Sequence, residues 1–422
     1  MGSSQKFNIA VIGLGYVGLP LAIEFSKHYS VVGYDISAKR IAALNNLTDN
    51  TLEVSSNQLN EAINSGNLEL STDLNSIQES NFFIVTVPTP IDNFKVPDLR
   101  PIKKAAEEIG TFLKSGDIVV FESTVFPGVT EDICAPILEI ASGLTFNKDF
   151  YCGYSPERIN PGDKEHTLTS IIKITSGSTP KIATIIDSVY SSIIDAGTHL
   201  ASSIKIAESA KVIENIQRDV NIALINELAT IFKKMDIPTS EVLAASGTKW
   251  NFLNFHPGLV GGHCIGVDPY YLTYKANSLG LNPELILASR RINDEMPNFV
   301  ANAVIKLMIE RGLSVLNANV LVYGVTFKAN CPDTRNTKVV NLINELSNFG
   351  CNISVIDPHA DKVDMLEEHG IKIFDESEIN VSGFDCVVYA VNHRSFNNIK
   401  FNYDQQLVFD VTSSLPNCPN SI

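Results

Sequence analysis

The feature that most constrains the fold is an alternation, from Phe7 onward, of short β-rich runs with segments of helix length. The runs read FNIAVIG, VVGYD, NFFIVTVP, DIVVFEST, FYCGYS and IIKITSG. Apolar runs of this kind are typical of strands buried on both faces, and the segments between them are long enough to connect parallel strands. The N-terminal part is therefore predicted to form a doubly wound parallel sheet.

The pattern changes near Ser202. A helical periodicity runs from there to Lys234 without interruption, and further helices are predicted in DPYYLTYKANSLG and from Pro283 to Arg311. After Gly312 the alternation returns with VLVYGV, ISVID, DCVVYAV and LVFDV, which predicts a second, smaller α/β domain.

We therefore expect an α/β protein in which a long central helix and a helical middle domain join two Rossmann-like, doubly wound domains. The middle domain is expected to carry the connecting helix. The expected boundaries are 1–200, 201–311 and 312–422.

Composition limits the kinds of partner. The chain has 422 residues, which is more than one core usually supports, and its net charge of −15 speaks against a general nucleic-acid binder. The seven cysteines are scattered and contain no C-x-x-C pair, so neither a disulfide framework nor a zinc site is indicated. The sequence shows no signal-peptide pattern and no apolar run near the roughly 18 residues that span a bilayer. We expect a cytoplasmic protein with no metal, no nucleic acid and no membrane partner.

The segment VIGLGYVGLPLA indicates a dinucleotide site. Gly13, Gly15 and Gly18 lie after a predicted strand and at the start of a predicted helix, where glycines allow a tight turn and close approach of a pyrophosphate. Asp35 ends the next β-rich run, where a carboxylate would hold the adenosine ribose and repel a 2′-phosphate. The expected cofactor is therefore NAD rather than NADP. The alternative is that the glycines only close a turn and Asp35 caps the next helix.

Further cofactor residues follow from their positions. Tyr16 and Val17 lie inside the glycine-rich loop. Pro88 and Thr89 end the run NFFIVTVP at the carboxyl edge, where sheets of this kind bind ligands. Arg40, on the helix predicted after the second strand, either contacts the adenine ribose or is a solvated helix charge.

The loop HPGLVGGHCIGVDPYYL contains a thiol in an unusual setting, because Cys264 lies among glycines rather than in an apolar strand or helix. A cysteine kept for packing behaves as a small buried hydrophobe. A thiolate in a loop can instead attack an aldehyde, and the thiohemiacetal can lose a second hydride to give a thioester that water opens. Cys264 is therefore a candidate nucleophile for two successive oxidations.

Three polar residues accompany the thiol as candidates. Asp268 precedes a proline, so it is either a helix N-cap or the group that orients the hydrolytic water. Lys211 and Asn215 are one turn apart on the long helix and share a face. That face is either solvated, or it holds a developing alkoxide on the substrate.

The ligand edge of the N-terminal sheet supplies three more candidates. Thr124 lies just beyond a predicted strand in FESTVFPG. Glu157 and Arg158 lie just beyond another predicted strand, in GYSPERINPG. Residues at the carboxyl ends of parallel strands are placed to contact ligands.

These residues lie in motifs that together resemble the UDP-glucose/GDP-mannose dehydrogenase family. From near residue 7 to near the C-terminus, the family's order is kept by GLGYVGLPLA, TVPTP, ESTVFPG, SPERI, ESAKVIEN, GGHCIGVDPYYL and GVTFKANCPDTRNT. The resemblance implies an enzyme that oxidises the C6 alcohol of a nucleotide sugar to a carboxylate, using two NAD per sugar and no metal.

The resemblance also implies the catalytic roles. Cys264 would be the nucleophile, and Lys211 and Asn215 would stabilise oxyanions at C6. Asp268 would assist the water and proton steps together with Lys211. Thr124 would hold an ordered water, while Glu157 matches a position associated with thioester hydrolysis.

For the substrate, the resemblance implies a loop from Phe255 to Gly262 along the sugar nucleotide. Its expected contact residues are Phe255, His256, Gly258, Gly261 and Gly262. Phe327 and Lys328 would contact the substrate from the C-terminal domain, which would hold most of the UDP, and Arg335 would reach the cofactor side. A homodimer formed through the long helix is also implied.

Some substrate assignments leave alternatives open. Relatives often supply an arginine from the neighbouring subunit near position 248, where this chain has Thr248 and Lys249. Arg290 or Arg291 is expected to contact the diphosphate, and the alternative is that both are helix-surface charges. His256 either bonds the substrate or caps the loop.

PERINPG, with Arg158 and Pro161, resembles the branch that acts on N-acetylated sugars. The expected substrate is UDP-N-acetylglucosamine, for surface polysaccharides such as capsule and O-antigen. UDP-N-acetylmannosamine and then UDP-glucose are the alternatives. A two-electron hydroxyacid dehydrogenase, which would not need Cys264, and a non-catalytic NAD-binding protein are alternatives of a different kind.

Overall fold

The computed structural model describes residues 7–92, 94–158, 166–262 and 265–422. Cys264 therefore lies outside the described residues. The chain forms two compact units, and the helical middle is shared between them: the first contains residues Met1–Glu214 and Tyr270–Leu279, and the second contains Asn215–Pro269 and Gly280–Ile422. The division into three domains stays a prediction.

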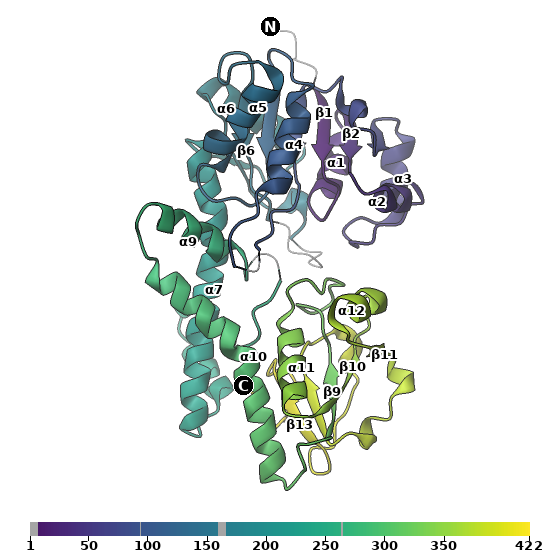
Figure 1. The fold of residues 1–422 in the computed structure, drawn as a ribbon, viewed down its shortest axis with the longest axis vertical. Helices are drawn as coiled ribbons and strands as arrows, with labels where there is room; N and C mark the ends of the chain where they lie inside the picture. Colours follow the sequence, from purple (N-terminus) through teal and green to yellow (C-terminus); the bar gives the residue numbers. More distant parts are fainter. Residues whose placement is uncertain (1–6, 93, 159–165, 263–264) are drawn as a thin grey trace. The chain divides into compact units, whose positions relative to one another are not determined.

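The first unit is built on a parallel sheet (Figure 1). Within the described residues it has six strands in the order β3-β2-β1-β4-β5-β6. Their bounds are β1 Asn8–Ile12, β2 Ser30–Tyr34, β3 Leu68–Ser71, β4 Phe82–Val85, β5 Ile118–Phe121 and β6 Tyr151–Tyr154. The order reverses between β1 and β4, which is the point where a sheet of this kind binds a dinucleotide.

Helices connect these strands. They are α1 Gly18–Ser26, α2 Ala38–Asn45, α3 Ser56–Asn64, α4 Arg100–Gly110 and α5 Ala135–Ser142, and a further helix, α6 Pro180–Ser191, follows the last of the six strands in the chain. Strands β4 and β5 are buried at every position, as the continuous apolar runs predicted. The run IIKITSG does form a parallel strand, β7 (Lys173–Thr175), but it pairs with β8 (Thr198–Leu200) in a separate small sheet. Next to β6, Gly153 and Gly177 pair as an isolated antiparallel bridge, so the main sheet ends at β6.

In the second unit, the described residues form a five-stranded parallel sheet in the order β11-β10-β9-β12-β13. The strands are β9 Asn319–Tyr323, β10 Asn352–Ile356, β11 Ile373–Phe374, β12 Cys386–Tyr389 and β13 Leu407–Asp410. The helices are α8 Thr239–Ser246, α10 Glu284–Glu310, α11 Lys338–Asn348 and α12 Lys362–His369. Apolar side chains of α10 and α11, such as Val304 and Leu342, pack with strand residues such as Val322 in one core. The opposite face packs Tyr323 and Tyr389 against Phe396, which lies in a short 3-10 turn.

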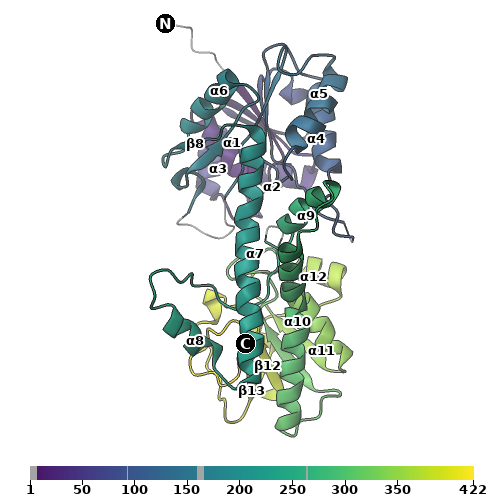
Figure 2. The ribbon, with the colours of Figure 1, turned by 90° about the vertical axis from the view of Figure 1, so that its left-hand side faces the viewer.

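Two helices contain three of the predicted catalytic positions. Helix α7 (Ile204–Lys234) is one continuous helix, as Figure 2 shows, and it carries Lys211 and Asn215. Helix α9 (Asp268–Ser278) begins at Asp268. None of the helices in the described part of the chain is long and apolar enough to cross a membrane.

Candidate functional site

The loop between β1 and α1 is shaped by its glycines. Gly13 has φ +94°, a conformation that other residues rarely adopt. A Cβ on Gly18 would lie 1.8 Å from the Gly13 carbonyl oxygen and 2.5 Å from Thr86 Oγ1, so only glycine fits. A Cβ on Gly15 would meet no described atom within 4 Å, which leaves that side of the loop open for a ligand. The loop therefore has the shape that a bound pyrophosphate requires.

Asp35 lies directly after β2 and beside this loop. Its carboxylate accepts hydrogen bonds from the backbone N–H groups of Leu14 and Ser37, both at 2.8 Å. The N-cap of α2 is Ser37, whose side chain accepts from the N–H of Arg40, so Asp35 does not cap that helix. The carboxylate is thus held at the edge of the glycine-rich loop, where the ribose of a dinucleotide is expected.

Arg40 is hydrogen-bonded to the backbone of the same loop. Its Nε donates to the Leu14 carbonyl oxygen at 2.8 Å, and its Nη1 lies 2.7 Å from Asp49 Oδ1. The arginine side chain is only 12% exposed, so it is not a solvated helix charge. Burial by itself would raise the pKa of Asp49, but hydrogen bonds from Thr51, Val54 and Arg40 outweigh it and lower the pKa.

The ends of β4 and β5 meet at the predicted ligand edge. Thr89 Oγ1 donates to the Thr124 carbonyl oxygen at 2.7 Å, and the Thr89 carbonyl accepts from the Tyr271 hydroxyl at 2.6 Å. The structure therefore brings together two predicted residues that are distant in the sequence.

Glu157 lies in a buried ionic cluster that sequence reasoning missed. Lys173 Nζ contacts Glu122 Oε2 at 2.6 Å and Glu157 Oε2 at 2.8 Å, and the Tyr190 hydroxyl donates to Glu122. Burial raises the pKa of Glu122 to about 7 despite the neighbouring ammonium. The buried Lys173 holds one carboxylate oxygen of Glu157. The other oxygen, Oε1, accepts a hydrogen bond from the Arg158 N–H at 2.5 Å, so both oxygens of the Glu157 side chain are fixed.

Arg158 connects Glu157 to helix α7 within the first unit. Its Nη1 donates to the Lys211 carbonyl oxygen at 3.3 Å, and its Nε lies 2.8 Å from Glu214 Oε2. The Lys211 side chain is buried, with 7% exposure, so it does not belong to a solvated helix face. Glu157, Arg158 and Lys211 therefore form one local group.

In the second unit, Asn215 and Asp268 are in direct contact. The Asn215 amide nitrogen donates to Asp268 Oδ2, and its oxygen accepts from Arg218 Nη2 at 2.5 Å. Both Asn215 and Asp268 are 1% exposed. Asp268 is thus the first residue of α9, and its carboxylate also accepts a hydrogen bond from the Asn215 amide, which fixes the orientation of that amide.

A cavity of about 240 Å³ lies at the carboxyl edge of the second sheet. The predicted residues Gly258, Phe327 and Lys328 line it, and so does Lys338, which sequence reasoning missed. Other lining groups are the polar side chains of Thr326, Thr337, Asn392 and Thr412. A concave site lined by two lysines, three threonines and one asparagine suits a phosphorylated, polar ligand.

The predicted glycines let the loop approach this cavity closely. Gly262 has φ +80°, and a Cβ there would lie 2.8 Å from the ring of Phe327. A Cβ on Gly261 would lie 2.8 Å from the Asn336 carbonyl oxygen, which also accepts from the Gly262 N–H at 3.3 Å. The backbone of the loop at Gly261 and Gly262 therefore packs directly against the segment that carries Phe327 and against Asn336.

The remaining predicted residues lie elsewhere in the second unit. Phe255 and His256 line a cavity of about 330 Å³ beside α8, and Lys249 lines another hollow with Phe252. Arg335 is 55% exposed and pairs with Asp333 at 2.6 Å.

The two arginines of α10 differ in their surroundings. Arg290 is 2% exposed and pairs with Asp219 at 2.5 Å and with Asp294 at 2.6 Å, so it is not a helix-surface charge. Arg291 is exposed.

A buried pair, Asp357 and His393, holds the segment that carries Phe327 and Lys328. Asp357 Oδ2 accepts from the N–H groups of Val325 and Thr326 at 2.7 and 3.1 Å, and it lies 3.1 Å from His393 Nε2. His393 Nδ1 accepts from the Asn330 N–H at 3.0 Å. The segment is therefore fixed at Val325 and Thr326 by Asp357 and at Asn330 by His393. Within it, Thr326 Oγ1 donates to the Lys328 carbonyl oxygen at 3.0 Å.

Fold and site together define a dehydrogenase that binds a dinucleotide on one unit and has a polar cavity on the other. Three family descriptions match consecutive parts of the chain: an NAD binding domain over residues 7–194, a central domain over 205–295 and a UDP binding domain over 321–417. The chain belongs to the UDP-glucose/GDP-mannose dehydrogenase family.

Individual relatives span nearly the whole chain. It is 54% identical over 418 residues to UDP-N-acetyl-D-glucosamine 6-dehydrogenase of Salmonella typhi, covering 98% of this chain and 97% of that protein. It is 57% identical over 395 residues to the enzyme of the same name in Pseudomonas aeruginosa, covering 94% and 92%. The solved UDP-D-ManNAc dehydrogenase of Pyrococcus horikoshii superimposes with a TM-score of 0.90 at 30% identity, covering 98% and 99%.

These comparisons confirm the resemblance seen in the sequence. They confirm the α/β fold, the oxidoreductase class and NAD as the cofactor. Among the described residues, no group of His, Cys, Asp and Glu side chains is arranged to hold a metal ion.

The position of Asp35 predicts its effect on cofactor choice. Replacing Asp35 by Ala should raise KM for NAD about tenfold or more and reduce the preference for NAD over NADP, because a charged acceptor for the ribose is lost. Steady-state kinetics with each cofactor measure both effects. Glu107→Ala, at an exposed position on α4, is the control. An unchanged KM for NAD in Asp35→Ala would contradict the assignment.

The Asp357 contacts predict a pH-dependent contribution to stability. Burial alone would raise the pKa of Asp357, but hydrogen bonds from His393 and from backbone N–H groups hold it at about 2. The ionised carboxylate therefore stabilises the fold above about pH 4, by about 2 kcal/mol, and this contribution is lost as the pH falls toward 2.

Urea unfolding of Asp357→Asn at several pH values tests this contribution. The variant should be less stable than the unmodified protein at neutral pH, and the difference should shrink in acid. Asp404→Asn, at an exposed position, should show no such trend. If the difference in free energy of unfolding between Asp357→Asn and the unmodified protein stays constant down to acid pH, ionised Asp357 is not the source of the stabilisation.

Proposed function

We propose that this chain oxidises the C6 hydroxyl of UDP-N-acetylglucosamine to a carboxylate and thereby supplies a uronate precursor for a surface polysaccharide. The observation that carries the choice of sugar is identity over nearly the full length. Two UDP-N-acetyl-D-glucosamine 6-dehydrogenases are 54% and 57% identical, whereas a UDP-N-acetyl-D-mannosamine dehydrogenase of Methanococcus maripaludis is 36% identical. Protein CapL of Staphylococcus aureus is 53% identical.

NAD, held by the glycine-rich loop and Asp35, would supply the hydride acceptor for C6 in each of the two oxidations. In the first, the C6 hydroxyl loses its proton and the alcohol becomes an aldehyde. The Cys264 thiolate then adds to the aldehyde carbon, and the resulting thiohemiacetal loses its hydroxyl proton and the second hydride to become a thioester. Water attacks the thioester carbon and gives up its protons, the C–S bond breaks, and the carboxylate product leaves while the Cys264 thiolate is regenerated.

The described residues support the polar steps of this scheme. Lys211 and Asn215 would hold the developing oxyanion, and the contact of Asn215 with Asp268 keeps its amide in one orientation. Asp268 would position the hydrolytic water. Glu157, fixed by Lys173, and Thr124, at the strand edge, would order water near the reacting carbon.

The sugar nucleotide would lie with its UDP in the 240 Å³ cavity of the second unit. Lys328 and Lys338 would place positive charge near the diphosphate, and Phe327 would pack against the ligand. The match of residues 321–417 to a UDP binding domain supports this placement. The other proposed ligand contacts are Lys249, His256, Arg290 and Arg335. The proposed location of the protein is the cytoplasm.

UDP-N-acetylmannosamine is the second candidate substrate. The solved UDP-D-ManNAc dehydrogenase with a TM-score of 0.90 favours it. The two sugars differ only in configuration at C2, so assays with both are needed to choose between them.

The proposed chemistry predicts the stoichiometry. With excess NAD and reaction to completion, about two NADH should form per UDP-N-acetylglucosamine consumed, because thioester formation needs a second hydride transfer. UDP-N-acetylmannosamine and UDP-glucose are run alongside. Cys264→Ser should lose steady turnover and still bind NAD with unchanged affinity. A ratio near one, or normal turnover in Cys264→Ser, would rule out the thioester route.

We further propose a homodimer formed through α7. The exposed side chains of Ile206, Ile213, Leu224 and Ile231 are separated by near-whole numbers of helical turns, so they form one apolar stripe. An exposed apolar stripe of this kind is typical of an interaction surface.

The stripe predicts how the dimer can be broken. The double variant Leu224→Asp with Ile231→Asp should become monomeric, because two charges would lie in an apolar interface. Light scattering after size exclusion gives the mass. Val363→Glu, which places a charge at an equally exposed helical site on α12, should leave the mass unchanged. A double variant with unchanged mass would exclude α7 as the interface.

A further inference from the structure

Asn226, in the interior of α7, is bonded to the backbone of the substrate loop. Its amide nitrogen donates to the Gly258 carbonyl oxygen at 3.1 Å, and its oxygen accepts from the Gly258 N–H at 2.8 Å. Asn226 is 0% exposed. One side chain thus satisfies both backbone groups of a glycine that lines the 240 Å³ cavity.

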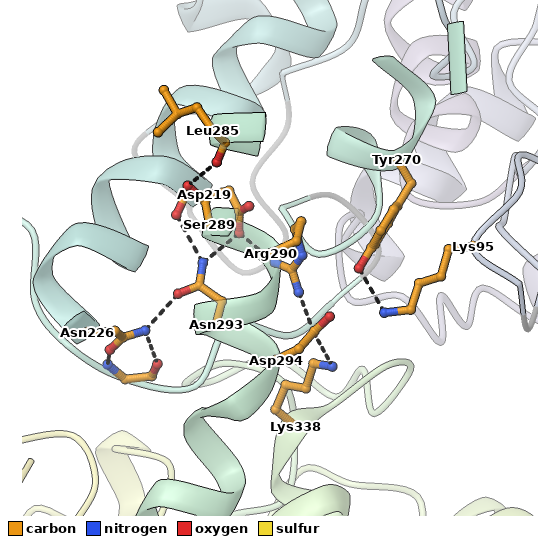
Figure 3. A network of polar contacts seen from close by, with 11 residues as sticks. Lys95, Asp219, Asn226, Tyr270, Leu285, Ser289, Arg290, Asn293, Asp294 and Lys338 are labelled. Atoms are coloured by element: carbon orange, nitrogen blue, oxygen red, sulfur yellow. Dashed lines mark hydrogen bonds and ion pairs between the residues drawn. The ribbon is translucent and has the colours of Figure 1, made fainter. Parts of the chain in front are cut away.

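Asn226 is itself held in place by a chain of polar contacts between α7 and α10 (Figure 3). Its amide nitrogen donates to Asn293 Oδ1 at 2.8 Å. The Asn293 amide nitrogen in turn donates to Asp219 Oδ1 at 2.8 Å and to the Asp219 carbonyl at 3.0 Å. These contacts orient both asparagine amides, because the oxygen and the nitrogen of each have distinct partners.

The chain continues to Lys338, a second residue that lines the cavity. Arg290 contacts Asp219 at 2.5 Å and Asp294 at 2.6 Å. Asp294 also pairs with Lys338 at 2.7 Å, and Lys338 begins α11 and lines the cavity. Figure 3 shows these side chains following one another from α7 through α10 to α11. Two carboxylates and two cations leave this part of the cluster formally neutral.

Packing of α7 against α10 does not by itself require these polar groups. Apolar residues of similar size could fill such a space without the desolvation cost of a buried carboxylate and two buried amides. They would, however, leave the Gly258 N–H and carbonyl without their partners. The arrangement therefore provides a fixed loop backbone rather than extra helix packing.

We propose that Asn226, backed by Asn293, is a positioning residue for nucleotide-sugar binding. It holds the backbone of Gly258, which lines the cavity, and the Asp219, Arg290 and Asp294 cluster holds Lys338, which also lines it. The inference rests on the proposed function, because it takes the cavity to be the place where UDP binds.

The test replaces Asn226 by Leu, which keeps the volume and removes both contacts to Gly258. KM for UDP-N-acetylglucosamine and the Kd for UDP alone, measured by titration calorimetry on the full chain, should each rise about tenfold. KM for NAD should change less than twofold, since the cofactor site is built from other elements. Asn221→Leu, on the same helix, removes only a bond to the helix carbonyl of Gln217 and should leave all three values unchanged.

A second variant keeps the inference testable if Asn226→Leu does not fold. Asn293→Ala leaves Asn226 and its contacts to Gly258 in place but removes the group that orients it. Its KM for the sugar nucleotide and its Kd for UDP should rise by a smaller factor, about threefold.

The outcomes separate the inference from the proposed function. Unchanged UDP affinity in Asn226→Leu, or in Asn293→Ala if only that variant folds, would show that the contacts merely fasten α7 to α10. That result would overturn the inference even if the unmodified enzyme oxidises UDP-N-acetylglucosamine. Weakened UDP binding together with no turnover of that sugar by the unmodified enzyme would support the inference and overturn the proposed substrate.

Discussion

The parallel arrangement of strands is the constraint on which both ligand regions depend. Every strand of a parallel sheet delivers its following residue to the same edge, so loops far apart in the sequence meet there. In the first unit this edge gathers Gly13, Asp35 and Thr89 after β1, β2 and β4. In the second unit it gathers Thr326 after β9 and Asp357 after β10. Each sheet thus provides a ligand edge from residues that have no local relation.

Buried polar contacts then give these edges a definite shape. Loops rich in glycine have little side-chain packing of their own, and their backbone groups need partners when buried. Asn226 provides such partners for Gly258, and Asp357 does so for Val325 and Thr326. An isolated buried charge would be costly, but each carboxylate here meets a cation, a histidine or several N–H groups. The same contacts that offset desolvation also fix the walls of the cavity.

Local reasoning from the sequence succeeded where the physical cause was local. The alternation of apolar runs indicated both parallel sheets, and the glycine spacing indicated the dinucleotide loop. It also placed Lys211 and Asn215 on one helical face, and the structure shows Lys211 buried. It failed for Lys173, whose strand lies in a separate small sheet, and for Asn226, because a buried ionic or amide contact has no characteristic spacing.

The sequence by itself determined the class of fold, the cofactor and the family, because hydrophobic periodicity and glycine motifs act over short stretches of chain. The tertiary structure decided which distant side chains meet. It paired Asn215 with Asp268, enclosed Lys173 between Glu122 and Glu157, and placed Arg290 between two aspartates rather than on a helix surface. These contacts depend on helix and strand packing across long sequence separations, which no local pattern encodes.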